Sequence, residues 1–128
     1  MSITHLNPPT LHTNPAFSQG VRIDGGQLVV VGGQNGTDQT GKVVDGGLGP
    51  QTAQALRNVL AVLAEAGADQ RHVAKLNIYV QAGSDVTAGY QAAAEVWGPN
   101  PTAITVLQVA GFARPEVLVE VDALAVVP

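Results

Sequence analysis

A strictly alternating segment near the C-terminus, Pro115–Val126, constrains the fold more than any other stretch. One set of alternate positions is wholly apolar: Val117, Val119, Val121, Ala123 and Ala125. A period of two is typical of a β-strand, so this set predicts a strand face packed on a core. The other set places Glu120 and Asp122 among apolar side chains, and such neighbours lie roughly 6–7 Å apart on one face. These carboxylates are either solvated at a rim or held for a function, and the alternation alone leaves both interpretations open.

Length and composition favour one small domain that associates with copies of itself. A chain of 128 residues fits a single domain, 1–128. Hydrophobic residues make up 45% of the chain and charged residues only 12%. A small domain with so few charges leaves apolar surface uncovered, which favours oligomerisation. Three prolines within residues 1–15 predict an irregular N-terminal arm there.

Charge and rare residue types exclude several classes of function. The net charge is −4, and the six basic residues are scattered rather than gathered in a patch, so we expect no nucleic-acid partner. The chain has no cysteine, and His5, His12 and His72 lack metal-ligand spacing, so no metal or cofactor is predicted. No apolar run approaches the roughly 20 residues that cross a bilayer, and the N-terminus has no signal pattern. We therefore expect a soluble, cytoplasmic protein with no membrane contact.

Periodicity and turn residues predict alternating strands and helices. Strands are expected at Phe17–Ile23, Gln27–Val31, Lys75–Val80, Ala103–Val109 and the C-terminal segment, with Lys42–Val44 as a further short strand. Helices are expected at Pro50–Ala66, closed by Gly67, and from a cap at Ser84 to Trp97. The turn Asp24–Gly26 predicts a hairpin between the first two strands, and Gly32–Gly41 is expected to be a loop.

This order of elements predicts both helices on one face of a mixed sheet. The other face would then be bare, yet Leu28–Val31 is continuously apolar, a pattern typical of strands buried on both faces. Ala103–Val109 is also too apolar to face water. We therefore expect the bare faces of several copies to pack together.

Five segments, in this order, resemble one known family. They are N-P-A-F-S-Q-G-V, V-V-V-G-G-Q, Q-T-A-Q-A-L-R-N-V-L-A-V-L-A-E-A-G-A, V-A-K-L-N-I-Y-V and L-V-E-V-D-A-L-A. Together they are similar to the reactive-intermediate deaminases (Rid, YjgF-like, also called L-PSP endoribonuclease-like proteins), over about residues 14–126. The resemblance implies a chorismate-mutase-like α+β fold (bacillus type) and a homotrimer whose sheets form a barrel. It also implies three clefts between subunits, where deaminating members hydrolyse imines or enamines such as 2-aminoacrylate.

The family's site residues are only partly kept. The resemblance places the water-positioning glutamate on Glu120. The cleft tyrosine falls on Phe17 and the cleft serine on Gly32, and neither residue carries a hydroxyl. An asparagine at the start of the second helix falls near Thr87. The arginine that binds the substrate carboxylate falls on Ile104, which cannot form that ion pair.

These departures change the expected substrate. The segment Pro99–Ala113 contains no basic residue, so a shifted alignment does not restore the arginine. We expect a small-molecule ligand that needs no carboxylate for binding. We do not expect the protein to be an efficient 2-aminoacrylate deaminase. In this hypothesis Glu120 orients water, while backbone groups near Gly33 and Thr105–Val106 polarise the substrate. The alternatives are a trimer that binds an apolar metabolite without turnover and, least favoured, an endoribonuclease.

Overall fold

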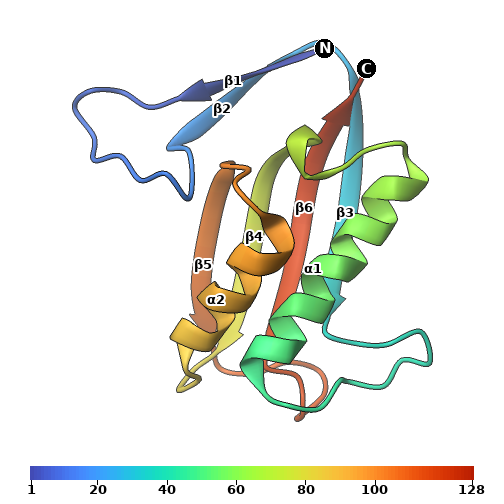
Figure 1. The fold of residues 1–128 in the computed structure, drawn as a ribbon. Coiled ribbons are helices and arrows are strands. Elements are labelled where there is room, and N and C mark those ends of the chain that lie inside the picture. The colour runs from blue at the N-terminus through green and yellow to red at the C-terminus, as the bar shows by residue number, and fades with distance from the viewer.

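The computed structural model describes all 128 residues and consists of a four-stranded sheet covered on one face by two helices (Figure 1). The strands are β3 (Gln27–Asn35), β4 (Val73–Gln81), β5 (Ala103–Val109) and β6 (Val119–Val127), and the helices are α1 (Leu48–Glu65) and α2 (Val86–Trp97). A short 3₁₀ helix, Gln70–His72, precedes β4. The sheet order is β3-β6-β4-β5. Only β4 and β5 are adjacent and parallel, so the predicted α+β class with a mixed sheet is confirmed.

The alternation in the C-terminal segment supplies the centre of the core. Its apolar set, from Val117 to Ala125, is at most 2% exposed, and it packs with α1 side chains such as Leu56, Val59 and Leu63. The regular strand begins at Val119, four residues later than predicted. Buried alternate side chains on β6 therefore fix which face of the sheet receives the helices.

Helix α1 ends at the glycine that the sequence predicted, whereas α2 begins with a different capping residue from the predicted one. After α1, Gly67 adopts a left-handed φ of 71°, the Ala68 N–H donates to the Leu63 carbonyl at 2.9 Å and the Gly67 N–H donates to the Ala64 carbonyl at 3.0 Å. This is a Schellman closure. At the start of α2 the capping side chain is Asp85, which accepts from the Thr87 N–H, rather than the predicted Ser84.

The N-terminal arm contains a strand that composition did not predict. β1 (Ser2–Leu6) pairs antiparallel with β2 (Gly20–Asp24), so the expectation of an irregular segment over residues 1–15 is wrong for its first part. The pairing joins residues separated by a proline-containing loop, and local composition carries no signal for such a distant partner. This two-stranded sheet lies beyond one end of the main sheet (Figure 1).

The predicted hairpin between the first two long strands is also wrong. β2 and β3 belong to different sheets, and Gly25 and Gly26, with φ of 75° and 91°, turn the chain from one sheet to the other. β3 instead pairs with β6 and continues to Asn35 through a bulge between Val31 and Gln34. The segment Gly32–Asn35, expected in a loop, is therefore the end of a strand. Near Lys42–Val44 only a single bridge forms, Thr37 to Val43.

The face of the sheet opposite the helices, which we call the open face, is bare in one chain. Leu28 and Val30 are each 65% exposed, whereas Val31 beside them is 2% exposed. Thus Leu28–Val31 is buried on one face only, and the expectation of burial on both faces fails for a single chain. Leu107 and Leu124 are exposed as well. Neither helix of the structure has the length and apolar character to cross a membrane.

Candidate functional site

The bulge in β3 positions the carboxylate of Glu120. The Asn35 Nδ2 donates to Glu120 Oε1 at 3.1 Å and to the Val119 carbonyl at 3.3 Å. A Cβ added at Gly33 would lie 2.6 Å from Glu120 Oε2, so the carboxylate rests directly on the glycine backbone. A bulge inserts an extra residue and redirects side chains at the edge of a sheet. We call Glu120, Gly33 and Asn35 the Glu120 site.

Helix α1 fixes the strand that carries Asn35. The Asn58 Nδ2 donates to the Asn35 carbonyl at 3.1 Å and to the Thr37 carbonyl at 2.9 Å. The Gln54 Nε2 in turn donates to Asn58 Oδ1 at 2.9 Å. At Gly36 the strand passes so close to α1 that an added Cβ would lie 2.5 Å from the Gln51 carbonyl oxygen. The end of β3 is therefore held against the helix by hydrogen bonds and by close packing.

The same helix holds the segment before β6. Gln51 is 4% exposed, its Nε2 donates to the Glu116 carbonyl at 3.0 Å, and its Oε1 accepts from the Leu118 N–H at 2.8 Å. The end of β3 and the segment that leads into β6, the strand that carries Glu120, are thus attached to one rigid element. Such support from surrounding groups limits the orientations that a functional side chain can adopt.

Polar side chains on the open face surround Glu120. Tyr79 is directly opposite Glu120 in the β4–β6 register. Loss of solvation is the main cause that raises the pKa of Tyr79, and the nearby carboxylates of Asp122 and Glu120 raise it further. The Asn77 Nδ2 donates to Asp122 Oδ1 at 2.7 Å. Glu120 itself is half-buried and takes part in none of the ion pairs of the chain.

Sequence reasoning missed Asn35 and Tyr79 as neighbours of Glu120, and Asn77 as the partner of Asp122. The alternation of β4 did place Asn77 and Tyr79 on one polar face, but only the register with β6 brings them beside the carboxylates. Asn35 had no signal, because it fell in a segment that glycine content predicted to be a loop.

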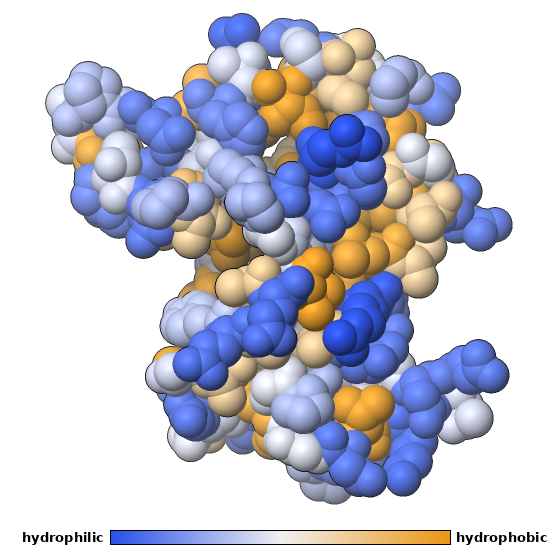
Figure 2. Space-filling view, viewed as in Figure 1, coloured by the Kyte–Doolittle hydropathy of each residue, from blue (hydrophilic) through white to orange (hydrophobic).

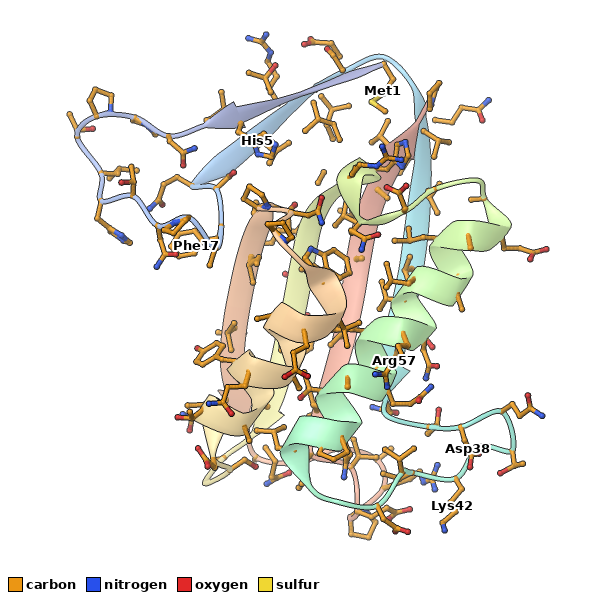
Figure 3. The ribbon with its side chains drawn as sticks, viewed as in Figure 1. Met1, His5, Phe17, Asp38, Lys42 and Arg57 are labelled. Atoms are coloured by element: carbon orange, nitrogen blue, oxygen red, sulfur yellow. The ribbon has the colours of Figure 1, made fainter.

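A second group of predicted site residues lines a groove on the helix side of the sheet. Phe17, Ile104 and Val106, together with Tyr90 and Trp97, border a groove of about 510 Å³, which we call the Phe17 groove. Of its 16 lining residues 11 are hydrophobic, and none is acidic, basic or histidine. Figure 3 shows Phe17 on the N-terminal segment, near the start of β5. Figure 2 shows apolar side chains in the recess between that segment and α2.

The two groups are separate within one chain. Leu76 is paired with Ile104 on one side and Ala123 on the other, and Ile104 packs against the core beneath the helices. Glu120 points to the opposite face, since it alternates with the buried Val119 and Val121. The side chains of Ile104 and Glu120 from the same chain therefore cannot meet in one cleft.

The remaining predicted residues are placed as follows. Gly32 is exposed, and a Cβ added there would meet nothing within 4 Å. Thr105 lies on the open face and accepts a hydrogen bond from Lys75 Nζ. Thr87 is exposed in the first turn of α2, on the helix side. Thus Gly32, Gly33 and Glu120 gather at the edge of β3, whereas Phe17, Ile104 and Val106 gather near β5.

The three histidines lie apart and take different local partners. His5 Nδ1 is 2.7 Å from the Ser18 hydroxyl, and the ring of His12 contacts the edge of Phe17 at a centroid distance of 6.1 Å. His72 closes a capping box with Asp69. No group of three or more metal-ligating side chains is formed.

Comparison with known proteins identifies the family. The family model described as Endoribonuclease L-PSP matches residues 9–127. A RutC family protein of Pyrococcus abyssi is 30% identical over 110 residues, which cover 85% of this chain and 84% of that protein. Protein DfrA of Myxococcus xanthus is 31% identical over 111 residues, covering 86% and 84% of the two chains.

Solved structures give the same result. The crystal structure of YyfB from Yersinia pestis, a protein of the conserved Rid family, superposes with a TM-score of 0.87 and 31% identity, covering 99% of this chain and 100% of that chain. Rv2704 of Mycobacterium tuberculosis, a member of the YjgF/YER057c/UK114 family, has a TM-score of 0.65 and 28% identity, covering 98% and 100%. The chain therefore belongs to the Rid (YjgF-like) family, whose model is described as Endoribonuclease L-PSP.

Proposed function

We propose that the chain forms a homotrimer with a cleft at each subunit contact. In this proposal the cleft hydrolyses a reactive imine or enamine, and the substrate needs no carboxylate group of its own for binding. The observation that carries this proposal is the Glu120 site. Its carboxylate is oriented by Asn35 at 3.1 Å and has no cationic partner. A fixed, unpaired and partly exposed carboxylate has the geometry required of a general base toward water.

The location of the two groups supports a cleft between subunits. β3 and β5 are the two edges of the four-stranded sheet, and an edge strand leaves backbone groups available to another chain. In a closed three-fold ring, the β3 edge of one subunit faces the β5 edge of the next. In the proposed trimer the Glu120 site at the β3 edge of one subunit and the Phe17 groove at the β5 edge of the next meet at the junction of the two sheets, and a complete cleft requires both.

The proposed reaction uses only water and this carboxylate. As the water oxygen bonds to the imine carbon, Glu120 accepts a proton from the water and delivers it to the nitrogen. The resulting carbinolamine then loses ammonia, its hydroxyl proton leaves with the nitrogen, and a carbonyl compound remains. In the cleft Gly33 and Thr105–Val106 contribute backbone groups near the reacting carbon.

The lining of the Phe17 groove supports a neutral substrate. It contains no charged side chain, and Ile104 takes the place where deaminating relatives carry the arginine for the substrate carboxylate. A carboxylate desolvated in such a groove without a partner is strongly disfavoured. An imine formed from a simple aliphatic or aromatic amine has no such charge.

A mixing experiment tests the shared cleft. In the assay an amine oxidase forms a neutral imine from benzylamine, and the released ammonia is measured. The variants Glu120→Gln and Ile104→Asp are each expected to be inactive. When the two variants are unfolded, mixed equally and reassembled, about one quarter of the clefts carry both intact groups, so activity reappears at roughly that level. If the mixture stays inactive while wild type treated in the same way recovers, the two groups do not share a cleft.

A second candidate is a trimer that binds an apolar metabolite without turnover. Phe17 and Gly32 lack the hydroxyls expected of a deaminase cleft, which favours this alternative. Under it, Glu120→Gln leaves ligand binding unchanged and wild type forms no product. Under the proposed reaction, the same substitution abolishes ammonia release.

Nucleic acid is a poor fit as a partner. Four of the six basic residues lie next to a carboxylate, in the pairs Arg22–Asp24, Lys42–Asp45, Arg71–Asp69 and Arg114–Glu116, and Lys75 donates to Thr105. Only Arg57, on α1, has no such contact (Figure 3). A phosphate backbone is bound by clustered basic side chains, and none are clustered in this chain.

A further inference from the structure

A small cavity beside the Phe17 groove is lined by residues of α1, α2 and the sheet. Its volume is about 30 Å³, and its walls include Leu48, Thr52, Val86 and Gly89. It shares four lining residues with the Phe17 groove: Ile78, Tyr90, Ala93 and Val106. The groove and this cavity, which we call the inner cavity, are therefore adjacent and are separated by shared side chains.

The inner cavity contains an unpartnered hydroxyl. Thr52 is 3% exposed, and its Oγ1 is the one buried side-chain polar atom of the chain that makes no hydrogen bond. A buried hydroxyl without a partner destabilises the fold, and most such groups in native proteins are paired. Replacement by valine would remove this cost at almost the same volume. A ligand that brings a hydrogen-bonding group into the cavity would supply the missing partner.

Gly89 creates the space in front of that hydroxyl. A Cβ added at Gly89 would lie 3.3 Å from Leu48 Cδ2 and 3.5 Å from Thr52 Oγ1. Glycine in the interior of a helix is destabilising relative to alanine, and the backbone at Gly89 has an ordinary φ that alanine also adopts. The helix thus lacks a methyl group at a point where one would narrow the inner cavity.

We propose that the inner cavity is the specificity pocket of the Phe17 groove, and that it binds the slim, uncharged hydrogen-bonding end of a neutral molecule with an apolar body. This inference rests on the proposed function in taking the groove as the ligand site. The Thr52 hydroxyl both donates and accepts, so it pairs with a ligand hydroxyl or carbonyl.

The dimensions restrict that end of the ligand. A cavity of this volume holds about two atoms larger than hydrogen, since one water needs roughly 10–15 Å³ measured in the same way. A hydroxymethyl or an aldehyde group fits, whereas a carboxylate or an ammonium would enter unpaired and is excluded. The apolar body remains in the groove beside Tyr90 and Val106.

The test uses hexan-1-ol and hexane as matched probes, with binding measured by calorimetry and by the emission of Trp97, the single tryptophan, which lines the groove. Wild type is expected to bind hexan-1-ol more tightly than hexane, and hexanoate not at all. Thr52→Val should weaken hexan-1-ol binding by about three- to tenfold and leave hexane binding unchanged, because one neutral hydrogen bond is lost. Thr52→Ser should retain the preference for the alcohol.

A second variant separates ligand binding from folding. Gly89→Ala gains helix propensity but brings a Cβ to 3.3 Å from Leu48 Cδ2, so the melting temperature should change little, while binding of hexan-1-ol weakens at least tenfold. Gly49→Ala is the matched control, because its added Cβ would meet Ala88 at an ordinary 3.5 Å and lies outside the inner cavity. Gly49→Ala should bind hexan-1-ol as wild type does.

Several results would overturn the inference. One is that wild type does not bind hexan-1-ol, and another is that wild type and Gly89→Ala bind it equally. A lower melting temperature of Thr52→Val would mean that the hydroxyl is already satisfied by an internal water. Ammonia release, by contrast, tests the proposed function alone. Loss of the alcohol preference with normal Glu120-dependent turnover refutes only this inference, and an intact preference without turnover refutes only the proposed reaction.

Discussion

Gly33 lies directly against the carboxylate of Glu120, so that a methyl group on its Cα would come within 2.6 Å of Oε2. The Glu120 side chain must therefore move if residue 33 is anything but glycine. We expect Gly33→Ala to break the Asn35–Glu120 hydrogen bond and to lower ammonia release at least tenfold. Stability should fall by no more than about 1 kcal/mol, because a half-buried flexible side chain can rotate away.

The matched control is Gly32→Ala, at the neighbouring position of the same bulge. A Cβ there meets no atom within 4 Å, so the Glu120 site should be unchanged in one chain. Side-chain resonances of Asn35 and the rate of ammonia release are compared between the two variants. Equal effects of both substitutions would show that the contact between Gly33 and Glu120 is unimportant.

A different glycine determines stability. A Cβ at Gly36 would lie 2.5 Å from the Gln51 carbonyl oxygen and 2.6 Å from its Cα, and these are backbone atoms of α1 that cannot rotate away. Gly36→Ala should force β3 and α1 apart and destabilise the fold by about 3 kcal/mol. Denaturant unfolding measures this loss of stability. Gly111→Ala is the tolerated control, because a Cβ added there has its nearest neighbour, Gln81 Oε1, at 3.7 Å.

Local pattern was sufficient to predict the core and the helices. The alternation in Val117–Ala125 predicted the buried face of β6 before its partners were known, and Gly67 predicted the end of α1. Both signals depend on residues close in sequence. The fold class then followed from the order of the elements and from the resemblance to the Rid family.

Pairing between distant segments could not be predicted in the same way. The turn at Gly25–Gly26 has the composition of a hairpin, yet it joins two sheets, because β6 offers β3 a longer partner. The strand Ser2–Leu6 exists only through its pairing with β2. For the candidate site, the resemblance to the Rid family placed Glu120 and Ile104 in one cleft between subunits, whereas in one chain strand alternation and register put their side chains on opposite faces.

The open face should determine the oligomeric state. Val30 is 65% exposed in one chain, so Val30→Asp adds a charge that an isolated subunit tolerates and a packed barrel does not. We expect light scattering at micromolar concentration to give the mass of three chains for wild type and of one chain for this variant. Val62→Asp, on the outer surface of α1 and 38% exposed, should remain trimeric. A single-chain mass for wild type would contradict the trimer.

Acid sensitivity should involve Asp69. A hydrogen bond from Arg71 is the main cause that lowers the pKa of Asp69 from its ordinary value of 3.8 to about 2. Because the folded pKa is below the unfolded one, the carboxylate stabilises the fold above about pH 4, and this contribution is lost as pH falls toward 2. The pair is exposed, so its contribution is below about 1 kcal/mol.

Two variants isolate that contribution. Asp69→Asn keeps an N-cap acceptor but removes the charge, so it should be slightly less stable than wild type at pH 5 and equally stable at pH 2. Arg71→Gln should have the same effect, since the pKa of Asp69 then returns toward 3.8. Urea unfolding at pH 5, 3 and 2 provides the measurement. A constant difference between wild type and Asp69→Asn at all three pH values would exclude the charge as its cause.

Ile104 faces the Phe17 groove, where deaminating relatives are expected to carry an arginine. Wild type should turn over 2-aminoacrylate poorly, because no cation there receives the substrate carboxylate. Ile104→Arg adds a guanidinium, which is desolvated among apolar side chains and should destabilise the fold by about 3 kcal/mol. Its charge can then pair with small carboxylates such as pyruvate or benzoate.

Calorimetry should therefore show carboxylate binding by Ile104→Arg and none by Ile104→Gln, a neutral control that also introduces a polar group. In one chain, Ile104 and Glu120 lie on opposite faces of the sheet, so only Glu120 of a neighbouring subunit can compete for the new guanidinium. Substantial deaminase activity should further require Phe17→Tyr and Gly32→Ser, which restore the missing hydroxyls, and Gly32 has space for the serine. If Ile104→Arg remains a folded trimer and yet binds no carboxylate, residue 104 does not line the ligand cleft. The substrate class would then have to be inferred from the Glu120 site alone.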